Sequence, residues 1–349
     1  MNNCILVTGG SGYIGSHTIV ELLEKGFEVI SVDNQSNSSI SAYENIFKIT
    51  GKRIMHYSID VCEQELLEKI FKQHHFSGII HFAAFKAVGE SVEFPLKYYH
   101  NNINSLINIL ELSKKYNVNN LIFSSSCSVY GNIDKLPVDE NTPLPNAESP
   151  YAYTKQIGEI ILKDVCKTNS NFNAISLRYF NPVGAHVSGL IGESSINKPN
   201  NLVPIITATA IGKIKQLSVH GNDYPTRDGT CIRDYIHVTD IARAHVLAMD
   251  KLINYKPQIN YDVINLGSGN GVSVLEMINA FEKISGEKLN YIIGPRRPGD
   301  VIAVYADNSK AKEYLNWNCE FDVYAMMKTA WKWEKNNNNP KLIKSKTNN

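Results

Sequence analysis

The feature that most constrains the fold is a regular alternation of apolar, β-rich runs with segments of helical periodicity along the first half of the chain. Strands are predicted over residues 4–8, 28–33, 53–58, 78–82, 120–125 and 173–179, and helices over residues 13–25, 96–116 and 152–166. Strands that are apolar along their whole length and alternate with helices are typical of a parallel sheet covered on both faces. The sequence therefore predicts an α/β fold with a Rossmann-type, doubly wound parallel sheet.

The second half of the chain differs in composition, because loops rich in Pro, Gly and Asn follow Phe180. We expect residues 1–180 to form the first domain and residues 181–335 to form a smaller mixed α/β domain. Residues 234–250 are typical of a strand, an N-cap at Asp240 and a helix, and we expect them to return to the first domain. Residues 336–349, where Asn and Lys dominate, predict a disordered tail.

Charge and cysteine usage exclude several classes of function. Lys and Arg total 35 against 34 for Asp and Glu, so this chain of 349 residues has no global field for nucleic acid or an anionic membrane. It shows neither a signal peptide nor an apolar run long enough to cross a bilayer. Its six cysteines are scattered, with no metal-ligand spacing, so we expect reduced thiols, a cytoplasmic location and no metal site.

A glycine-rich turn follows the first predicted strand and opens the first helix. It reads Thr8-Gly-Gly-Ser-Gly-Tyr-Ile-Gly15, which places Gly9, Gly12 and Gly15 at three-residue spacing. Glycines allow a tight turn and a close approach of the backbone to a ligand, and a helix N-terminus offers N–H groups to a pyrophosphate. The turn therefore favours a dinucleotide, although a purely structural glycine turn stays open as an alternative.

Asp33 ends the second predicted strand, about 20 residues beyond the glycine turn, where an acidic residue accepts hydrogen bonds from an adenosine ribose. No Arg or Lys lies between Asp33 and Tyr43 to receive a 2′-phosphate, which favours NAD over NADP. Asp60 follows the third strand and could hold the adenine edge, or it could be a surface turn residue.

The chemistry is expected at the end of the fifth predicted strand, in Ser124-Ser-Ser-Cys-Ser128. Tyr151 and Lys155 lie four residues apart and would share one helix face. An ammonium about 4 Å from the phenol would favour the tyrosinate by roughly 4 kcal/mol at an effective dielectric constant of about 20, before the cost of desolvation is subtracted, and this could bring tyrosine chemistry toward neutral pH. We interpret Ser126 as a hydroxyl beside Tyr151, and Cys127 as buried filler rather than a nucleophile.

The glycine turn, the serine triplet and Tyr-x-x-x-Lys together resemble the extended short-chain dehydrogenase/reductase superfamily. Five further strings are similar to the UDP-glucose 4-epimerase family, over residues 3–335: His81-Phe-Ala-Ala-Phe-Lys86, Tyr98-Tyr-His-Asn-Asn102, Arg178-Tyr-Phe-Asn-Pro-Val-Gly-Ala185, Asn200-Asn-Leu-Val-Pro204 and Arg233-Asp-Tyr-Ile-His-Val238.

The resemblance implies a role for each matching position. Tyr151 is the base, Lys155 activates it and anchors the nicotinamide ribose, and Ser126 bonds the sugar 4-hydroxyl. With these three, the positions that match NAD contacts are Gly9, Gly12, Tyr13, Ile14, Gly15, Asp33, Asn34, Asp60, Val61, Phe82, Ala83, Lys86, Asn101 and Phe180. The positions that match UDP-sugar contacts are Lys86, Ser126, Tyr151, Asn181, Asn201, Leu202, Ser218, His220, Arg233, Arg297, Asp300 and Val304.

The resemblance also implies a reaction. UDP-glucose and UDP-galactose interconvert in galactose metabolism by transient oxidation at sugar C4, and the hydride then returns to either face of a 4-keto intermediate. NAD stays tightly bound, because it is regenerated in each cycle. A homodimer is implied, paired through the helices at residues 96–116 and 152–166.

Two positions depart from the family pattern. Pro298 stiffens the string Arg297-Pro-Gly-Asp300, and Phe85 stands where a smaller aliphatic residue is common. Val304 matches a position whose bulk limits the sugar pocket. Because valine is intermediate in size, we expect partial activity on UDP-GlcNAc.

Several rival functions agree less well with the sequence. The 4,6-dehydratases need an acid and a base after the serine, where this chain has Cys127 and Ser128. UDP-glucuronate decarboxylases and 4-epimerases need a group for the substrate carboxylate, and the sequence offers no obvious candidate. A non-catalytic NAD-sensing regulator would commonly lose the Tyr/Lys pair that is retained here.

Overall fold

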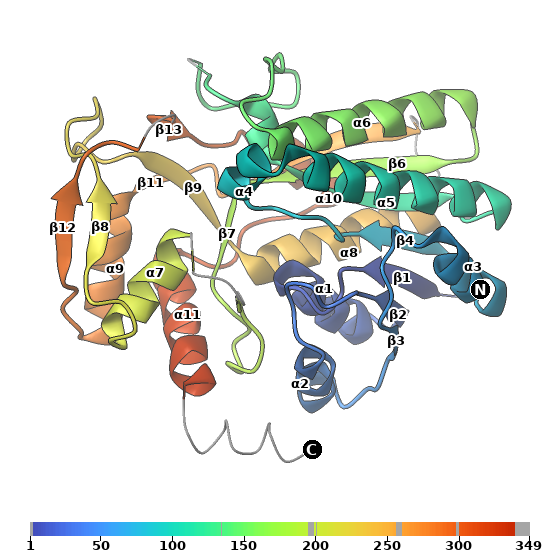
Figure 1. The fold of residues 1–349 in the computed structure, drawn as a ribbon, viewed down its shortest axis with the longest axis horizontal. Helices are drawn as coiled ribbons and strands as arrows, with labels where there is room; N and C mark the ends of the chain where they lie inside the picture. Colours follow the sequence, from blue (N-terminus) through green and yellow to red (C-terminus); the bar gives the residue numbers. More distant parts are fainter. Residues whose placement is uncertain are drawn as a thin grey trace.

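The computed structural model of the chain describes residues 3–133, 135–194, 199, 201–255, 260–297 and 300–338. A seven-stranded parallel sheet forms its larger part (Figure 1). In spatial order its strands are β10 (Tyr261–Leu266), β6 (Asn173–Tyr179), β5 (Asn120–Ser126), β4 (Gly78–His81), β1 (Cys4–Thr8), β2 (Glu28–Val32) and β3 (Met55–Tyr57). The chain moves outward from β1 in both directions, so the predicted doubly wound parallel sheet is confirmed.

Alternating side chains of the apolar strands face opposite layers of helices. In β1, Ile5 and Val7 join one buried cluster while Cys4 and Leu6 join the other. The first layer consists of α1 (Tyr13–Glu24), α2 (Ser41–Thr50), α8 (Val238–Asn254) and α10 (Ser309–Leu315). The second consists of α3 (Gln64–Gln73), α5 (Pro95–Lys115) and α6 (Pro150–Thr168), with α4 (Val88–Glu93) packed against α5 and α6.

A smaller region carries the remaining elements, at the left of Figure 1. Its four-stranded sheet contains β11 (Gly271–Ser273), β9 (Ile232–His237), β13 (Ala303–Val304) and β7 (Asn181–Val183), and a two-stranded sheet joins β12 (Tyr291–Gly294) to β8 (Leu217–His220). Its helices are α7 (Leu202–Ala210), α9 (Val274–Ser285) and α11 (Val323–Asn337). A separate buried cluster that includes Ile206, Phe281 and Met327 forms its core.

The sheet includes one strand that the sequence analysis placed elsewhere. β10 comes from residues assigned to the second domain, yet it pairs with β6 at the edge of the larger sheet. α8 packs against α1 and the same sheet, while β9 belongs to the smaller region. The exact domain boundaries stay a prediction.

The expected N-cap at Asp240 is wrong. Helix α8 begins at Val238 after an N-cap at His237, whose ring nitrogen accepts a hydrogen bond from the Thr239 amide at 3.1 Å. The carboxylate of Asp240 instead accepts from the amides of Glu320 and Phe321 at 3.2 and 3.3 Å, which ties α8 to the segment before α11.

Residues 336 and 337, which were predicted to belong to the tail, are the last residues of α11. The rest of that prediction, residues 339–349, lies outside the described residues. Within the described ranges, no helix is both long and apolar enough to cross a membrane. The short 3₁₀ helix η1 (Cys127–Tyr130), which follows β5, completes the set of elements and belongs to the candidate site.

Candidate active site

The predicted site residues gather at the carboxyl edge of the larger sheet. The glycine turn follows β1, Asp33 follows β2, Phe82 follows β4 and Ser126 ends β5. Strands β1 and β4 are neighbours in the sheet, although their connections run outward on opposite sides. Ligands of open α/β sheets bind in the crevice that such a reversal creates.

The three glycines of the turn have different physical roles. Gly9 has φ +72° and closes against the segment after β4, because a Cβ there would lie 2.8 Å from the Ala83 amide nitrogen. A Cβ on Gly15 would lie 2.2 Å from the Gly9 carbonyl oxygen, so Gly15 lets α1 pack onto the turn. At Gly12 a Cβ would meet that same oxygen at 3.1 Å and nothing nearer, which leaves its outer side open to a ligand.

Asp33 is buried, and its carboxylate is held by hydrogen bonds from the glycine turn and from the loop after β2. Its carboxylate accepts hydrogen bonds from the Ser11 amide at 3.0 Å, the Gln35 amide at 2.8 Å and the Ser38 hydroxyl at 3.0 Å. A carboxylate has about four acceptor positions, so one remains for a ribose hydroxyl. Asp33 thus joins the glycine turn to the loop after β2.

The residues after β3 are tied to this loop. The Asn34 amide donates to the Asp60 carboxylate at 2.8 Å, and the same carboxylate accepts from the Cys62 amide at 2.8 Å. Val61, between them, is buried in the core. Asn34 and Asp60 therefore form the outer wall of the predicted adenine position.

The segment after β4 is fixed to β1 through Thr8. The Phe82 amide donates to the Thr8 carbonyl at 3.1 Å, and the Ala83 amide donates to the Thr8 hydroxyl at 3.3 Å. The Lys86 ammonium, further along this segment, forms an ion pair with Glu193 at 3.2 Å. Asn101 lies on α5 and donates from its side-chain amide to Asn102 at 2.9 Å.

The predicted Tyr/Lys pair lies on the face of α6 that covers β5. Helix α6 starts at Pro150 after Ser149, whose hydroxyl accepts from the Ala152 amide at 3.2 Å. The Ser126 side chain lies beside the Tyr151 phenol and lowers its pKa, and the Lys155 ammonium donates to the Ser124 carbonyl at 2.6 Å. The structure therefore brings Ser126, Tyr151 and Lys155 together.

The electrostatics of this pair differ from the sequence-based expectation. Desolvation raises the pKa of Tyr151 to about 12, against the opposing effect of its hydrogen bond to Ser126. Desolvation also lowers the pKa of Lys155 to about 7, which the charge of Glu159 partly offsets. The Lys155 nitrogen lies 5.9 Å from the centroid of the Tyr151 ring, and Lys155 is not among the groups that shift the pKa of Tyr151, so it does not bring that pKa toward neutrality as expected.

The predicted substrate residues lie mainly in the smaller region, and several of them already form ion pairs or hydrogen bonds. Arg233 on β9 forms a partly buried ion pair with Asp300, and Val304 on β13 pairs with Arg233 in register. Glu193 accepts from Lys86 and, at 2.9 Å, from the Asn201 amide. Leu202 opens α7, and the exposed Arg297 accepts from the Asp300 amide through its carbonyl at 3.1 Å.

Two predicted substrate residues are separate from this group. Ser218 and His220 lie on β8, in the two-stranded sheet, and neither side chain bonds Arg233 or Asp300 within the described structure. Phe180 and Asn181, in contrast, connect β6 to β7 between the two regions. Phe180 packs with Tyr130 and Val304 in one buried cluster.

Three buried polar atoms near the site have no hydrogen-bond partner in the described part of the chain: Asn181 Oδ1, Ser128 Oγ and Tyr224 Oη. Buried polar atoms are normally satisfied, so each of these three is a candidate contact for a ligand. The sequence analysis identified Asn181 but missed Tyr224, whose surroundings include Asp300 and Arg233. Its place in the loop Gly221-Asn-Asp-Tyr-Pro225 gave no chemical signal.

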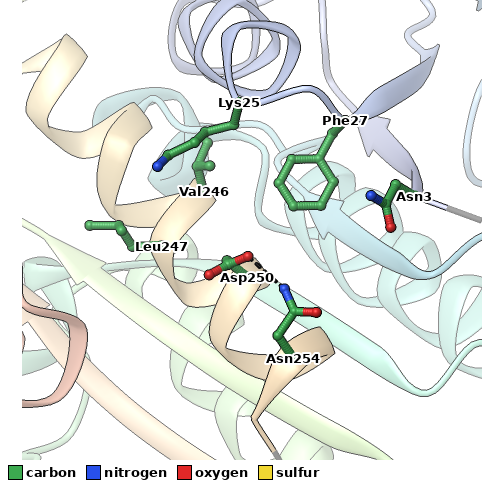
Figure 2. Close-up of a pocket in the computed structure, with 7 residues that line it drawn as sticks. All are labelled: Asn3, Lys25, Phe27, Val246, Leu247, Asp250 and Asn254. Atoms are coloured by element: carbon green, nitrogen blue, oxygen red, sulfur yellow. Dashed lines mark hydrogen bonds between the residues drawn. The ribbon is translucent and has the colours of Figure 1, made fainter. Parts of the chain in front are cut away.

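A cavity of about 120 Å³ lies at the opposite edge of the sheet, where the strands begin (Figure 2). Phe27, Lys25 and residues of α8, including Asp250 and Asn254, line it, and the last two are joined by a hydrogen bond of 2.7 Å. It contains none of the predicted site residues.

Comparison with known proteins agrees with this geometry. A family model described as GDP-mannose 4,6 dehydratase matches residues 6–330. A UDP-glucose 4-epimerase of Bacillus subtilis (strain 168) is 48% identical over 335 residues, which cover 96% of this chain and 98% of that protein.

Two solved structures have the same fold over nearly the whole chain. The UDP-glucose 4-epimerase of Bifidobacterium longum, in complex with NAD+ and UDP, has a TM-score of 0.90 and 46% identity, covering 96% of this chain and 98% of its own. That of Stenotrophomonas maltophila, with bound NAD and formylated UDP-arabinopyranose, has a TM-score of 0.92 and 44% identity, covering 95% and 97%.

The parallel sheet, the glycine turn and the Ser/Tyr/Lys group define an extended short-chain dehydrogenase/reductase. Within that class, the chain belongs to the UDP-glucose 4-epimerase family.

The residues present fit NAD. Gly12 leaves the backbone open at the N-terminus of α1, and Asp33 keeps an acceptor position for a ribose hydroxyl. Lys155 and Tyr151 lie further along the same edge, where a nicotinamide ribose would be held. Most of the predicted NAD-contacting residues therefore lie near the carboxyl ends of β3, β2, β1, β4 and β5, which are consecutive in the sheet.

Proposed function

We propose that this chain interconverts UDP-glucose and UDP-galactose, with NAD retained as its cofactor. The observation that carries the proposal is the grouping of Ser126, at the end of β5, with Tyr151 and Lys155 of α6 at the sheet edge that also carries the glycine turn. A hydroxyl and a phenol that share a proton at this edge suit the oxidation of a secondary alcohol.

NAD, when bound, accepts a hydride from sugar C4 and returns it. Tyr151 takes the proton of the 4-hydroxyl as the C4–O bond becomes a carbonyl, and gives it back when the alcohol re-forms. Ser126 holds the sugar oxygen in hydrogen-bond reach of the phenol. Electrons and protons balance over one cycle, so no external oxidant is needed.

Inversion at C4 needs a hexose that can turn while the nucleotide stays bound. Arg233 and Arg297 can each donate paired hydrogen bonds to a diphosphate, and Asp300 can accept from a uridine ribose. The ion pair between Arg233 and Asp300 is then exchanged for contacts with the ligand. Binding free energy concentrated on the UDP group leaves the 4-keto sugar free to present either face.

Dehydration of the sugar is the alternative that the name of the matching family raises. It requires an acid and a base beside the hydroxyl group that leaves. Desolvation raises the pKa of the Cys127 thiol to about 12, and Ser128 offers a buried hydroxyl. Neither is a carboxylic acid or a carboxylate, so these positions favour epimerisation.

Substrate breadth depends on the sugar pocket. Val304 is buried against Phe180 and Tyr130, next to Arg233 in the sheet. We propose partial activity on UDP-GlcNAc, because valine leaves more space than a tyrosine would. A complete absence of UDP-GalNAc after long incubation, with an enzyme active on UDP-glucose, would remove this part of the proposal.

A cytoplasmic homodimer, paired through α5 and α6, also belongs to the proposal. These helices pack on each other and expose apolar side chains, including Leu96 at 79% and Ile160 at 58%. Burying such surface favours association. Sedimentation should show a dimer that Ile160→Glu converts to a monomer; a monomeric parent protein would contradict this.

The proposed function is tested by incubating purified protein with UDP-galactose, without added NAD, and measuring UDP-glucose in a coupled assay. Conversion is the expected result, with UDP-GlcNAc assayed in parallel. Absence of conversion even with NAD supplied, together with turnover of UDP-glucuronate, would overturn the substrate assignment while leaving the Tyr/Lys chemistry in place.

A further inference from the structure

Helix α6 carries a third buried polar residue in line with the Tyr/Lys pair. Tyr151, Lys155 and Glu159 are spaced four residues apart and contact three consecutive residues of β5. Tyr151 lies beside Ser126, Lys155 donates to the Ser124 carbonyl, and Glu159 accepts from the Ser125 hydroxyl at 2.6 Å. One face of α6 therefore contacts each of the last three residues of β5.

Glu159 is also held from the neighbouring strand. Arg178 on β6 occupies the register position opposite Ser125 and donates twice to the Glu159 carboxylate, at 2.9 and 2.6 Å. The two charged side chains are only 5% and 7% exposed. Arg178 further donates to the Tyr130 hydroxyl at 2.9 Å, and this hydroxyl bonds Asn265 on β10 at 2.7 Å.

We propose that the Glu159–Arg178 pair positions Ser126 and sets the charge of Lys155, so that Glu159 acts on the reaction without touching the substrate. The proposal rests on the proposed function for its effect on turnover, while its effect on Lys155 can be measured without any substrate.

Among the described groups that face Lys155, Glu159 is the anion that stabilises the protonated form of the lysine. On α6 these groups are Tyr151 and Glu159. β5 contributes the Ser124 carbonyl and the Phe123 ring, whose centroid is 4.9 Å from the ammonium. On β4, His81 is neutral because burial, with the Lys155 charge, lowers its pKa to about 3. Arg178 on β6 stands behind Glu159 and reduces the influence of its charge.

Loss of the Glu159 charge would weaken the hold of Lys155 on its proton. The productive state has an ammonium beside a tyrosinate, and it contains the same number of protons as a neutral amine beside a neutral phenol. A lower pKa of Lys155 makes the productive state rarer. It also lets the pair lose its first proton at lower pH, so the acid limb of the pH–rate profile moves in the same direction.

The first variant is Glu159→Gln, which keeps the shape of the side chain and leaves the Arg178 cation unopposed. We expect kcat to fall about tenfold for each unit by which the pKa of Lys155 decreases. The acid limb should move to lower pH by the same amount, with KM changed less than kcat. A loss that is merely structural would lower kcat and leave the acid limb where it is.

The double variant Glu159→Gln/Arg178→Gln separates charge from fold, because replacing both members of a buried ion pair avoids an uncompensated charge. We expect it to titrate closer to the parent protein than the single variant does. Ser125→Ala is the matched control, since it removes a hydrogen bond to Glu159 and no charge, and it should leave the titration of Lys155 in place.

Lys155 can be titrated directly by NMR in protein labelled with ¹³C at lysine, with its signal assigned through Lys155→Arg. The proposal predicts a decrease of the Lys155 pKa in Glu159→Gln that is larger than in the double variant. Equal titration in all variants, or a double variant shifted further than the single one, would overturn it. The parent protein's epimerase assay stands apart, so failure of the proposed function would be visible separately.

Discussion

The two ends of the candidate site differ in how far they are prepared for their ligands. At the cofactor end, the turn at Gly9, the bonds of Asp33 and the Thr8 contacts are internal to the fold, and Gly12 faces open space. At the nucleotide-sugar end, Arg233 is paired with Asp300 and Lys86 with Glu193. Under the proposed function, the difference means that a retained cofactor meets a preformed surface, whereas a substrate that comes and goes replaces contacts that the protein makes with itself.

The largest effect is expected from a substitution at Tyr151, where the cofactor end and the nucleotide-sugar end of the site meet. Tyr151→Phe removes the hydroxyl that bonds Ser126 but keeps the ring. Turnover should fall by about 10³-fold or more, because proton transfer from the sugar hydroxyl loses its base. NAD content, measured after release from the purified protein, should be unchanged.

Tyr153→Phe is the matched control for that variant. Tyr153 lies on the same helix, is 47% exposed and has no assigned role in the site. It should keep the parental rate. A Tyr151→Phe enzyme with near parental turnover would show that the phenol is not the base.

Arg233→Lys tests the exchange of ion pairs at the nucleotide-sugar end. Lysine keeps the charge but loses the paired donors, so KM for UDP-galactose should rise about 10- to 100-fold, with a smaller change in kcat. Asp300→Asn should also raise KM, and NAD content should not change in either variant. Loss of NAD instead of substrate affinity would contradict the division between the two ends.

A pair of glycine variants sharpens the description of the cofactor end. A Cβ at Gly15 would clash with the Gly9 carbonyl, so Gly15→Ala should lower the free energy of unfolding by about 1–3 kcal/mol. Gly12→Ala should cost less stability and reduce the amount of NAD retained. Denaturant unfolding and NAD content measure the two effects, and equal behaviour of both variants would refute their separate roles.

Two buried imidazoles, of His17 and His237, and the half-buried imidazole of His186 lie where the two regions meet. The rings of His17 on α1 and His186 lie 6.4 Å apart, and His237 ends β9. Desolvation lowers the pKa of His17 and of His237 to about 3. The unfolded chain binds protons at these positions below about pH 6.5 while the folded chain does not. The free energy of unfolding should therefore fall as pH decreases from 6.5 toward 3.

Each such histidine contributes about 1.4 kcal/mol per pH unit in that window. His17→Gln should make the decrease shallower, whereas His100→Gln, at an exposed position on α5, should leave it unchanged. Thermal unfolding between pH 4 and 7.5 measures both. An unchanged slope for His17→Gln would show that this imidazole is not neutral in the folded protein.

Sequence patterns over short ranges predicted those parts of the fold that depend mainly on residues close together in the chain. The alternation of strands and helices placed six strands of the sheet, and glycine spacing placed the turn after β1. β10 was missed because it joins β6 only after the chain has passed through the smaller region, and a short apolar run does not indicate which sheet it enters. Aspartate is a preferred N-cap residue, which favoured Asp240, but the ring of His237, three residues earlier, takes that role.

Electrostatics were the least predictable part of the site. The spacing of Tyr151 and Lys155 correctly indicated a shared helix face, but not how strongly desolvation raises the pKa of Tyr151 and lowers that of Lys155. The partner of Arg233 is 67 residues distant in sequence. The position of Glu159, four residues after Lys155 on a predicted helix, could be read from the sequence. Its role could not be inferred without the structure, which shows its hydrogen bonds with Ser125 and Arg178.

The central claim is that one retained cofactor removes and returns the hydrogen at sugar C4 within a single catalytic cycle. The most direct test uses UDP-galactose deuterated at C4 in ordinary water with excess unlabelled NADH, followed by NMR of the UDP-glucose formed. We predict that deuterium stays at C4 of the product. Product with ordinary hydrogen at C4 would contradict the account, because the hydrogen would have been exchanged with solvent or with free cofactor.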